Sequence, residues 1–327
     1  MKVSVCIPVY GVEKYIERCA RSLFEQTMKD DIEFIFVDDC TPDKSIEVLK
    51  EVLKEYPERK DQVKIIRHEV NKGVSAARKT ALSAASGDYI IFCDSDDWVD
   101  LNLYETMYKQ AVEKNADIAC CAIIFERINR ASFRLDMKYD TIDEMFLHYF
   151  NSAKFNSLCH KMVLRKVVLA SHKTVPDAVI MAEDLLFVAQ IMLNAKTMTV
   201  CNNVCYHYFF CNPNSVTLNL NRRTFESEVA VSEIMSSILP EKYKYLILSL
   251  KGQALFSALS TPQISSKEYF SIYGKGIIAK IILSFIKAKY ISWDKKIILL
   301  ASLFSYHLAR FLCRIRLKLV HKIRIGK

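Results

Sequence analysis

The first 125 residues alternate short apolar runs with segments in which apolar side chains recur at helical spacing. Runs rich in Val, Ile and Phe are typical of buried strands, and a 3.6-residue period is typical of helices with one buried face. The pattern predicts strands at 3–9, 33–37, 63–67, 89–93 and 117–125 and helices at 13–26, 42–56, 75–85 and 103–114. This order predicts an α/β fold with a doubly wound, mostly parallel sheet, in which ligands bind beyond the carboxyl ends of the strands.

Local signals mark the ends of several helices. Thr41, followed by a proline, is expected to cap the second helix, and Pro57 is expected to stop it. Past residue 126 the alternation weakens, and past Arg222 the pattern is helical, with Pro240 and Pro262 as breaks. Three regions are therefore expected, at 1–125, 126–221 and 222–327.

The composition describes a folded protein of a reducing compartment. Of the 327 residues 51% are hydrophobic and 25% charged, which excludes a disordered chain. The eleven cysteines include no C-x-x-C pair and are expected to be small buried hydrophobes of a cytoplasmic protein. The first apolar run is too short for a signal peptide. A zinc site is the weaker interpretation of four residues in a strand-like pattern, Cys201, Cys205, His207 and Cys211.

Three carboxylates follow the fourth strand. Asp94, Asp96 and Asp97 lie within four positions, where like charges repel and raise one another's pKa. A divalent cation, Mg²⁺ or Mn²⁺, bound by these hard oxygen ligands would keep them ionised, and substrate phosphate usually completes such a shell. The alternative is a solvated acidic turn or the N-cap of the next helix. Asp38 and Asp39 end another parallel strand and are expected at the same edge of the sheet.

Phosphate in this chain must be held without a glycine-rich loop. The chain has seven glycines and neither G-x-G-x-x-G nor G-x-x-x-x-G-K-[ST]. Four other motifs occur in order between residues 8 and 98: Pro8-Val9-Tyr10, Val37-Asp38-Asp39, Asn71-Lys72-Gly73-Val74-Ser75-Ala76-Ala77-Arg78 and Asp94-Ser95-Asp96-Asp97-Trp98. In this order and spacing they resemble the family 2 glycosyltransferases, which have the GT-A fold.

The resemblance implies where a nucleotide-sugar donor, expected to be a UDP-sugar, is bound. Asp39 matches the acid that hydrogen-bonds the base, and the motif that begins at Pro8 matches the loop that lines the nucleotide pocket. Asp94 looks like the ribose contact and an acid of the D-x-D motif, and Asp96 matches the ligand of the metal that bridges the diphosphate. The residues expected to contact the donor are Pro8, Val9, Tyr10, Asp39, Asn71, Gly73, Arg78, Asp94 and Ser95; Asp96 and Asp94 are expected to bind Mn²⁺ or Mg²⁺.

Two residues of these motifs have competing interpretations. Arg78 is either a contact to the nucleotide or phosphate or a charge on a helix surface. Asp97 either orients Asp96 or caps the next helix.

A second carboxylate pair precedes an apolar helix predicted at 185–193. Glu183-Asp184 matches the family's Glu-Asp pair at a helix N-terminus, in which the Asp of inverting enzymes is the general base. Such a carboxylate takes the proton of the acceptor hydroxyl as its oxygen attacks the anomeric carbon. Asp184 is therefore the expected catalytic residue; the alternative is a helix-start residue favoured by the helix dipole. Residues 206–208 followed by 214–217 resemble the family's closing strand and loop over the donor.

The basic character of the chain is confined to its C-terminal segment. Residues 274–327 contribute +12 to the net charge of +9, from thirteen Lys or Arg against Asp294, so the rest sums to −3. The longest uncharged apolar run, 297–309, is shorter than the roughly 18 residues that span a bilayer. Six apolar side chains fall on one helical face with basic residues beside it: Leu308, Phe311, Leu312, Ile315, Leu319 and Ile323.

This segment is expected to lie on an anionic membrane surface, because aliphatic and basic side chains occur together in it. The alternative is a helix packed on the body with a solvated basic face. No nucleic-acid partner is expected, because the basic residues alternate with aliphatic side chains and not with stacking aromatic ones.

The resemblance implies inverting, metal-dependent transfer of a single sugar to a glycan acceptor, expected to be lipid-linked, in bacterial capsule, exopolysaccharide or lipopolysaccharide synthesis. One sugar per encounter is expected because the Gln-x-x-Arg-Trp motif of processive synthases is absent: neither Trp98 nor Trp293 follows an Arg. The expected location is the cytoplasm, peripherally at the inner face of the cell membrane.

The three regions would then be the nucleotide-sugar-binding half, 1–125, the acceptor-side half, 126–221, and the helical region with the membrane-associating tail, 222–327. Two alternatives remain open. A phosphatase of the haloacid-dehalogenase type also has a strand that ends in D-x-D and would act on phosphosugars. A sugar-nucleotide binding module with a dead site is the non-enzymatic one.

Overall fold

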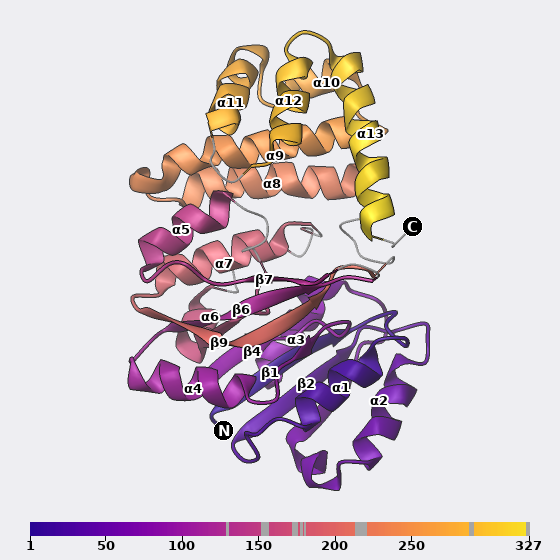
Figure 1. Cartoon of the computed structure of the whole chain (residues 1–327), viewed down its shortest axis with the longest axis vertical. Coiled ribbons are helices and arrows are strands. Elements are labelled where there is room, and N and C mark those ends of the chain that lie inside the picture. Colours follow the sequence, from indigo (N-terminus) through magenta and orange to yellow (C-terminus); the bar gives the residue numbers. More distant parts are fainter. Residues whose placement is uncertain are drawn as a thin grey trace. The chain divides into compact units, whose positions relative to one another are not determined.

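The chain forms two compact units (Figure 1). The computed structural model describes residues 1–128, 131–151, 157–171, 176, 179, 181–212, 221–287 and 291–324. The first unit, named here the sheet unit, comprises Met1–Met145, Ser157–Asp177 and Phe187–Asn212. The second, the helical unit, comprises Phe146–Asn156, Ala178–Leu186 and Pro213–Lys327.

The sheet unit is built on a mixed sheet that has nine strands among the described residues. The strands run in the order β3-β2-β1-β4-β8-β6-β9-β5, and β7 pairs with β6. The first four in this order are parallel, as predicted, whereas β8 is antiparallel to both β4 and β6. The strands are β1 (Val3–Val9), β2 (Ile32–Asp38), β3 (Val63–Arg67), β4 (Tyr89–Phe92), β5 (Trp98–Val99), β6 (Ile118–Glu126), β7 (Phe133–Leu135), β8 (Lys161–Leu164) and β9 (Met198–Phe209).

Helices cover both faces of this sheet, which confirms the doubly wound arrangement. Successive side chains of a strand point to opposite faces. On one face of β2, Phe34 and Phe36 contact Phe24 of α1. On the other face, Glu33 accepts hydrogen bonds from the N–H and hydroxyl of Ser86, which follows α3. The helices up to residue 194 are α1 (Ile16–Phe24), α2 (Ser45–Lys54), the 3₁₀ helix η1 (Pro57–Gln62), α3 (Val74–Ala84), α4 (Leu103–Glu113), α5 (Ile142–Asn151), α6 (Arg165–Ser171) and α7 (Glu183–Asn194).

The second helix begins later than the sequence predicts, and its predicted cap is wrong. α2 begins at Ser45, and the Thr41 hydroxyl accepts a hydrogen bond from the Gly11 N–H (2.9 Å) and donates one to Asp43 Oδ1 (2.7 Å). Asp43 Oδ1 accepts a hydrogen bond from the Ser45 N–H (3.1 Å). Asp43 therefore provides the acceptor at the helix start that the sequence predicts from Thr41. Thr41 instead ties the chain after β2 to the loop after β1.

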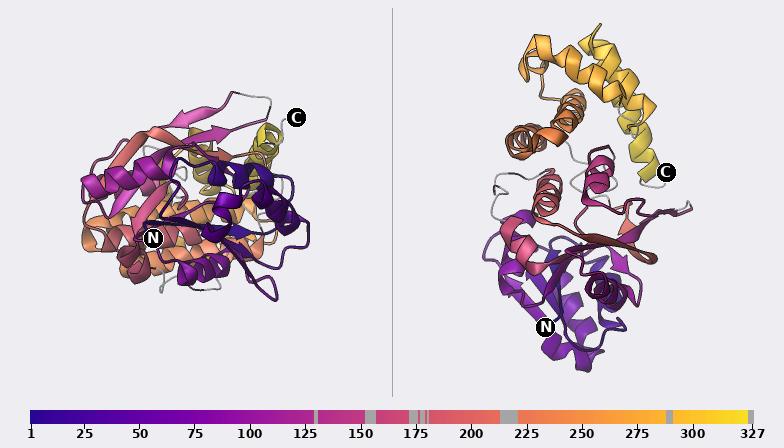
Figure 2. Two further views of the ribbon diagram at one scale, coloured as in Figure 1. Left: turned by 90° about the horizontal axis from the view of Figure 1, so that it is seen from below. Right: turned by 90° about the vertical axis from the view of Figure 1, so that its left-hand side faces the viewer.

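The helical unit packs its helices around one apolar cluster that includes Leu255, Phe285 and Leu299. α11, α12 and α13 all pack on α9, and α12 packs on both α11 and α13 (Figure 2). The breaks at Pro240 and Pro262 are confirmed, since α8 ends before the first and α9 before the second. The helices are α8 (Arg222–Ile238), the 3₁₀ helix η5 (Glu241–Leu246), α9 (Ile247–Ser260), α10 (Ser266–Ser271), α11 (Lys275–Lys287), α12 (Trp293–Ser302) and α13 (Tyr306–Arg324).

The apolar run at 297–309 is not one helix, because α12 ends at Ser302 and α13 begins at Tyr306. In the part of the chain that the structure describes, no helix combines the length and the apolar character that crossing a membrane requires.

Gly252 allows α9 and α11 to approach closely. A Cβ built on Gly252 would lie 2.3 Å from Cδ2 and 2.8 Å from Cγ of Phe285, a fully buried residue. We expect Gly252→Ala to lower the free energy of unfolding of the helical unit by about 1–3 kcal/mol, because the ring and both helices are already packed. Differential scanning calorimetry of the full chain checks this expectation.

Gly276→Ala is the matched control, since no heavy atom lies within 4 Å of its added methyl group. We expect this control to be neutral or to stabilise α11 by up to about 1 kcal/mol. If both variants melted like the wild type, α9 and α11 would not be in the close contact described above.

Candidate active site

The predicted site residues of the sheet unit lie at one edge of the sheet. In the parallel register Val9 of β1 lies opposite Asp38 of β2, and Cys6 lies opposite Phe92 of β4. The loops that follow β1, β2 and β4 therefore emerge side by side. This edge brings together the motifs that begin at Pro8, Val37 and Asp94, as the sequence predicts for a doubly wound sheet.

Asp97 anchors the loop after β4 to β9. Asp97 is fully buried, and its carboxylate accepts hydrogen bonds from Tyr206 Oη (2.6 Å) and from the Phe209 N–H (2.7 Å). Burial, together with Asp96 and Asp94, holds the pKa of Asp97 well above its usual range. The helix-cap interpretation of Asp97 is wrong, since the N-cap of α4 is Asn102. Asp97 fixes the loop that carries the other two carboxylates.

Asp94 is joined to both α3 and β9. Its Oδ1 atom lies 3.1 Å from Arg78 Nη2, and its backbone N–H donates to Tyr206 Oη (3.1 Å). Arg78 is only 7% exposed, so it is not a charge on the helix surface. The pair places a guanidinium beside the carboxylate that the sequence assigns to the ribose and the metal.

Asp96, like Asp97, lies in an environment that disfavours a charged carboxylate. Burial and the nearby Asp94 raise its pKa to about 6, against the favourable hydrogen bond that Asn212 Nδ2 donates to its Oδ2 atom (2.7 Å). With this pKa the carboxyl is still mostly ionised at pH 7, and a positive charge beside it would favour the ionised form further. The environment of Asp96 therefore fits a cation ligand.

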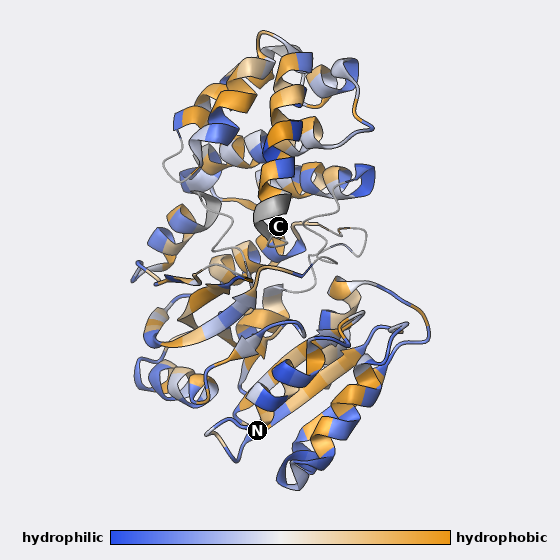
Figure 3. Ribbon diagram, turned by 45° about the vertical axis from the view of Figure 1, so that its right-hand side comes forward, coloured by the Kyte–Doolittle hydropathy of each residue, from blue (hydrophilic) through white to orange (hydrophobic). Residues whose placement is uncertain are grey.

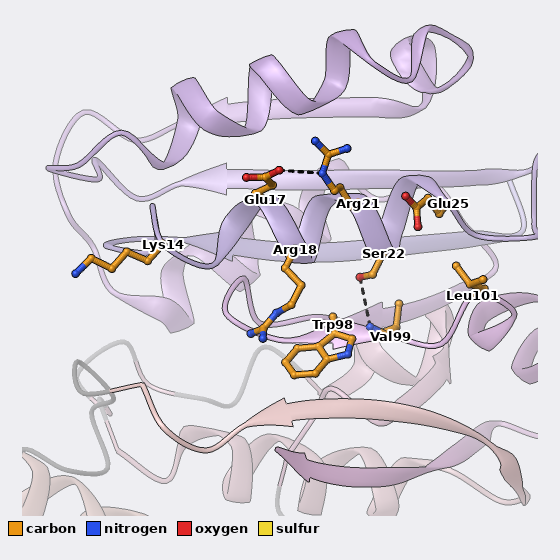
Figure 4. A pocket seen from close by; sticks show the side chains of 9 residues that line it. All are labelled: Lys14, Glu17, Arg18, Arg21, Ser22, Glu25, Trp98, Val99 and Leu101. Carbon is orange, nitrogen blue, oxygen red and sulfur yellow. Dashed lines mark hydrogen bonds and ion pairs between the residues drawn. The ribbon is translucent and has the colours of Figure 1, made fainter. Parts of the chain in front are cut away.

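Arg18 of α1 holds the same loop from its other side. Its guanidinium lies 3.6 Å from the centre of the Trp98 ring, and Nη2 donates to the backbone carbonyl of Asp96 (2.9 Å). Figure 4 shows Arg18 extending from α1 towards Trp98 in a pocket whose lining also includes Glu17 and Leu101. On the Trp98 ring, His207 is stacked at 5.1 Å between centroids.

Sequence reasoning predicts a closing strand at 206–208 but does not identify Arg18, Tyr206 and Asn212 as partners of this loop. Tyr206 and Asn212 lie 109 and 116 positions beyond the carboxylates they bind, and Arg18 lies on a helix without a local motif. Only the pairing of β5 with β9 brings the end of β9 to this loop.

The donor atoms of the loop fit a hard divalent cation. Asp94 and Asp96 offer carboxylate oxygens, which Mg²⁺ and Mn²⁺ prefer. Within the described ranges, no group of three or more His, Cys, Asp or Glu side chains could hold an ion by itself. An ion held by Asp94 and Asp96 would therefore need further ligands from water or from a bound diphosphate, as is usual for Mg²⁺.

Asp39 organises the turn that precedes α3. Its carboxylate accepts hydrogen bonds from the backbone N–H groups of Lys72 (2.9 Å) and Gly73 (2.7 Å), and it lies 2.7 Å from Nδ1 of His68. Gly73 has a φ of 86°, which a side chain would strain. Asp39 is buried, and it fixes the 71–73 turn whether or not it also contacts a base.

The remaining donor residues differ in exposure. Tyr10 is half exposed and Asn71 is exposed, so both are accessible to a ligand. Val9 and Ser95 are buried, and Pro8 is partly buried. Any contact from Val9 or Ser95 would therefore come from the backbone or need a small rearrangement, and the roles of all five stay predictions.

Glu183 and Asp184 form the first turn of α7, as predicted. The residue before them, Ala182, has a φ of 64°, which is rare for a residue with a side chain. Cys40, which follows Asp39, has a φ of 56°. Cys40 and Ala182 therefore flank predicted sites, whereas the other two non-glycine residues with positive φ in the described part of the chain, Asp31 and Asn115, precede β2 and β6. Residues 214–217, the predicted closing loop, lie outside the described residues.

The cysteines of the zinc interpretation are buried, and His207 has other partners. Nδ1 of His207 lies 2.8 Å from Glu126 and Nε2 lies 2.9 Å from Asp100. Ten of the eleven cysteines are buried and Cys40 is partly buried, as expected for small apolar side chains.

Carboxylates and a buried guanidinium at the carboxyl edge of a doubly wound sheet are typical of a ligand-binding α/β protein. The profile of "Glycosyl transferase family 2" matches residues 4–171, which is half of the chain. The chain belongs to this family, and this membership argues against the phosphatase alternative.

Two curated relatives illustrate how much of the chain is shared. GlyA of Streptococcus pneumoniae is 44% identical over 118 residues, which are 36% of this chain and 16% of GlyA. EpsH of Bacillus subtilis is 28% identical over 250 residues, which are 74% of this chain and 70% of EpsH. The chain thus spans a minor part of GlyA and most of EpsH.

Two solved structures share the fold. That of Staphylococcus aureus TarS 1–349 in complex with UDP-GlcNAc matches with a TM-score of 0.62 at 21% identity, over all of this chain and 93% of that one. TarS is a poly(ribitol-phosphate) beta-N-acetylglucosaminyltransferase. The mannosyltransferase PcManGT of Pyrobaculum calidifontis, in complex with GDP-Man and Mn²⁺, matches with a TM-score of 0.57 at 13% identity, over 98% of this chain and 86% of that one. The GT-A fold that the sequence predicts is confirmed.

We expect Tyr206→Phe to loosen the loop that carries Asp94 and Asp96. The change removes the hydroxyl that joins Asp97 to the Asp94 N–H and leaves buried polar groups without a partner, which costs about 1–3 kcal/mol of stability. If the loop conformation that binds UDP becomes less stable, UDP affinity should fall about tenfold for each 1.4 kcal/mol by which that conformation is destabilised. Thermal unfolding and calorimetric titration with UDP measure both effects.

Tyr108→Phe is the control, because Tyr108 packs on Tyr89 in the same unit but its hydroxyl is not part of this network. A Tyr206→Phe protein as stable as this control, with unchanged UDP affinity, would show that the network does not hold the loop.

Proposed function

We propose that this chain transfers a single sugar, with inversion, from a UDP-sugar to a glycan acceptor in the synthesis of a bacterial surface polysaccharide: capsule, exopolysaccharide or lipopolysaccharide. The observation that carries the proposal is the D-x-D loop, in which Asp94 and Asp96 are held by partners from three other segments. Family membership supports the reaction class. The complex of TarS with UDP-GlcNAc supports a UDP-sugar as donor.

The D-x-D carboxylates would hold Mn²⁺ or Mg²⁺, and the Mn²⁺ complex of PcManGT supports this assignment. A bound cation of this kind neutralises negative charge that develops on a departing diphosphate. Arg78 orients Asp94, and Asn212 orients Asp96. Asp39 and the 71–73 turn would fix the nucleotide end of the donor.

Asp184 is proposed as the general base. Its place in the first turn of α7, after the strained Ala182, leaves its carboxylate at a helix N-terminus, where the dipole favours the ionised form. An ionised carboxylate can accept the proton of the attacking acceptor hydroxyl. Glu183 would position the loop beside it.

The acceptor is proposed to be a lipid-linked glycan, so that the enzyme works in the cytoplasm at the inner face of the cell membrane. The strongly basic segment 274–327 supports this location. The absence of Gln-x-x-Arg-Trp supports one sugar per encounter.

A titration with nucleotides tests the donor and the metal. We expect UDP or a UDP-sugar with Mn²⁺ to raise the melting temperature, since a ligand at a hundred times its Kd stabilises by about 2.7 kcal/mol. UDP without metal and GDP with metal should give clearly smaller shifts. If UDP and UDP-sugars never stabilise the protein, with or without Mn²⁺, the proposed donor is wrong. If the protein binds the donor but neither hydrolyses it nor transfers its sugar to any acceptor, the dead-site alternative is supported.

Two substitutions separate the proposed metal ligand from the proposed base. Asp96→Asn removes a charged ligand, so both UDP binding with Mn²⁺ and turnover should fail. Asp184→Asn should leave UDP binding nearly intact and lower kcat by roughly 10² or more, the usual scale of a lost general base. Glu183→Gln, the neighbouring carboxylate, is the control and should lose far less activity.

Equal loss of nucleotide affinity in the Asp96 and Asp184 variants would place Asp184 on the donor side or in a structural role. Equal turnover of the Asp184 and Glu183 variants would remove Asp184 as the base.

A further inference from the structure

The outer surface of the helical unit exposes most of the large apolar side chains that the described residues expose. Eleven of the eighteen such residues belong to the segment 277–319. On α12 they recur at i, i+4 and i+7, and on α13 at i, i+3, i+7 and i+11, so each set forms one stripe along its helix. These nine residues, named here the outer stripe, are Trp293, Ile297, Leu300, Leu303, Phe304, Leu308, Phe311, Ile315 and Leu319.

The outer stripe is not needed for folding, because both helices already bury a different face. α12 buries Ile298 and Leu299 in the apolar cluster of the unit, and α13 buries Ala309 and Cys313. Counted at 100° per residue, the exposed and buried sets of each helix lie on roughly opposite sides. The helices are therefore apolar on two sides, and one of these sides has no partner within the unit.

The two stripes form one surface. α12 and α13 pack against each other and both pack on α9, so the sides that face away from α9 lie together. The turn between the helices carries Leu303 and Phe304, and Phe304 is 85% exposed. Figure 3 shows apolar positions recurring along these helices of the unit. An apolar surface of this extent is typical of an interaction site.

Positive charge borders this surface. Arg314 and Lys318 are exposed, and their positions on α13 lie beside the stripe of that helix. The single acid of the segment 274–327, Asp294, is already paired with Arg316. The ligand must therefore accept large apolar side chains and also carry negative charge.

We propose that the outer stripe, with Arg314 and Lys318, is a docking surface for an anionic phospholipid bilayer. Large aliphatic and aromatic side chains enter the boundary between headgroups and acyl chains, while Lys and Arg remain at the level of the phosphates. A second copy of the chain fits less well, because two segments of charge +12 would face each other. This inference rests on the membrane location in the proposed function and names the residues that would contact the membrane. Its test needs no transferase activity.

Vesicle binding of the full chain tests the proposal. Sedimentation is measured with vesicles of phosphatidylcholine alone and with vesicles that contain 30% phosphatidylglycerol, where about one lipid in three carries a negative charge. We expect binding to the anionic vesicles that weakens with salt and is at least tenfold weaker on the neutral ones.

Two variants with matched controls identify the surface. The triple variant Phe304→Ser, Phe311→Ser, Leu319→Ser should lose tenfold or more in binding, whereas Leu101→Ser with Val112→Ser, exposed apolar residues of the sheet unit, should not. Arg314→Glu with Lys318→Glu should lose tenfold or more on anionic vesicles, whereas Lys50→Glu with Lys60→Glu, exposed in the sheet unit, should lose much less.

Trp293 provides a direct reporter, because the chain has only one other tryptophan. In a Trp98→Phe background, its emission should shift to the blue on anionic vesicles and be quenched by brominated lipid.

Every variant is first shown to be folded by its circular dichroism spectrum and melting temperature, which separates loss of the surface from loss of the fold. UDP titration of the same samples reports separately on the donor site. The proposal is overturned if the wild type does not bind anionic vesicles, or if the surface variants bind like their controls. It is also overturned if the wild type forms a dimer that the triple variant dissolves and shows no lipid-dependent shift, because a second copy would then cover the stripe.

Discussion

The confinement of three carboxylates to one short loop at the end of a buried strand is the constraint on which the rest of the site depends. Asp97 is fully buried and Asp94 and Asp96 are partly buried, and burial and mutual repulsion raise the pKa of Asp96 and of Asp97. The compensating groups come from α1, α3 and the end of β9. Much of the sheet unit must therefore fold before the loop has its shape, and a change in any of these segments reaches the donor site.

A second set of hydrogen bonds replaces the glycine-rich loop that many nucleotide-binding sheets use. Asp39 holds the 71–73 turn through two backbone N–H groups, and Thr41 joins the chain after β2 to the loop after β1. Side chains from neighbouring strand ends fix these loops, and two glycines in them, Gly11 (φ 67°) and Gly73 (φ 86°), use the conformational freedom of glycine. Loops that are held by such hydrogen bonds before a ligand arrives lose less entropy on binding.

The helical unit shows that basic residues in one segment serve different purposes. Arg310 donates to the carbonyl of Ile264 and Arg316 pairs with Asp294, so these two stabilise the packing of α13. Arg314 and Lys318 remain exposed beside the outer stripe. The same division holds for the apolar residues, since Leu312 packs towards the core while Phe311 and Ile315 face solvent.

The sequence by itself determined the parallel half of the sheet, most of the helices and the edge that carries the carboxylates, because period and strand-end residues are local signals. It did not show that β8 enters the sheet antiparallel, or that Asp97 is an anchor for Tyr206, because these pairings join residues far apart in the chain. It grouped Leu312 with the other apolar side chains of one helical face, because helical spacing does not show which part of a face a neighbouring helix covers. Only the packing of α12 and α13 on α9 decided which apolar side chains were buried and which were left facing solvent.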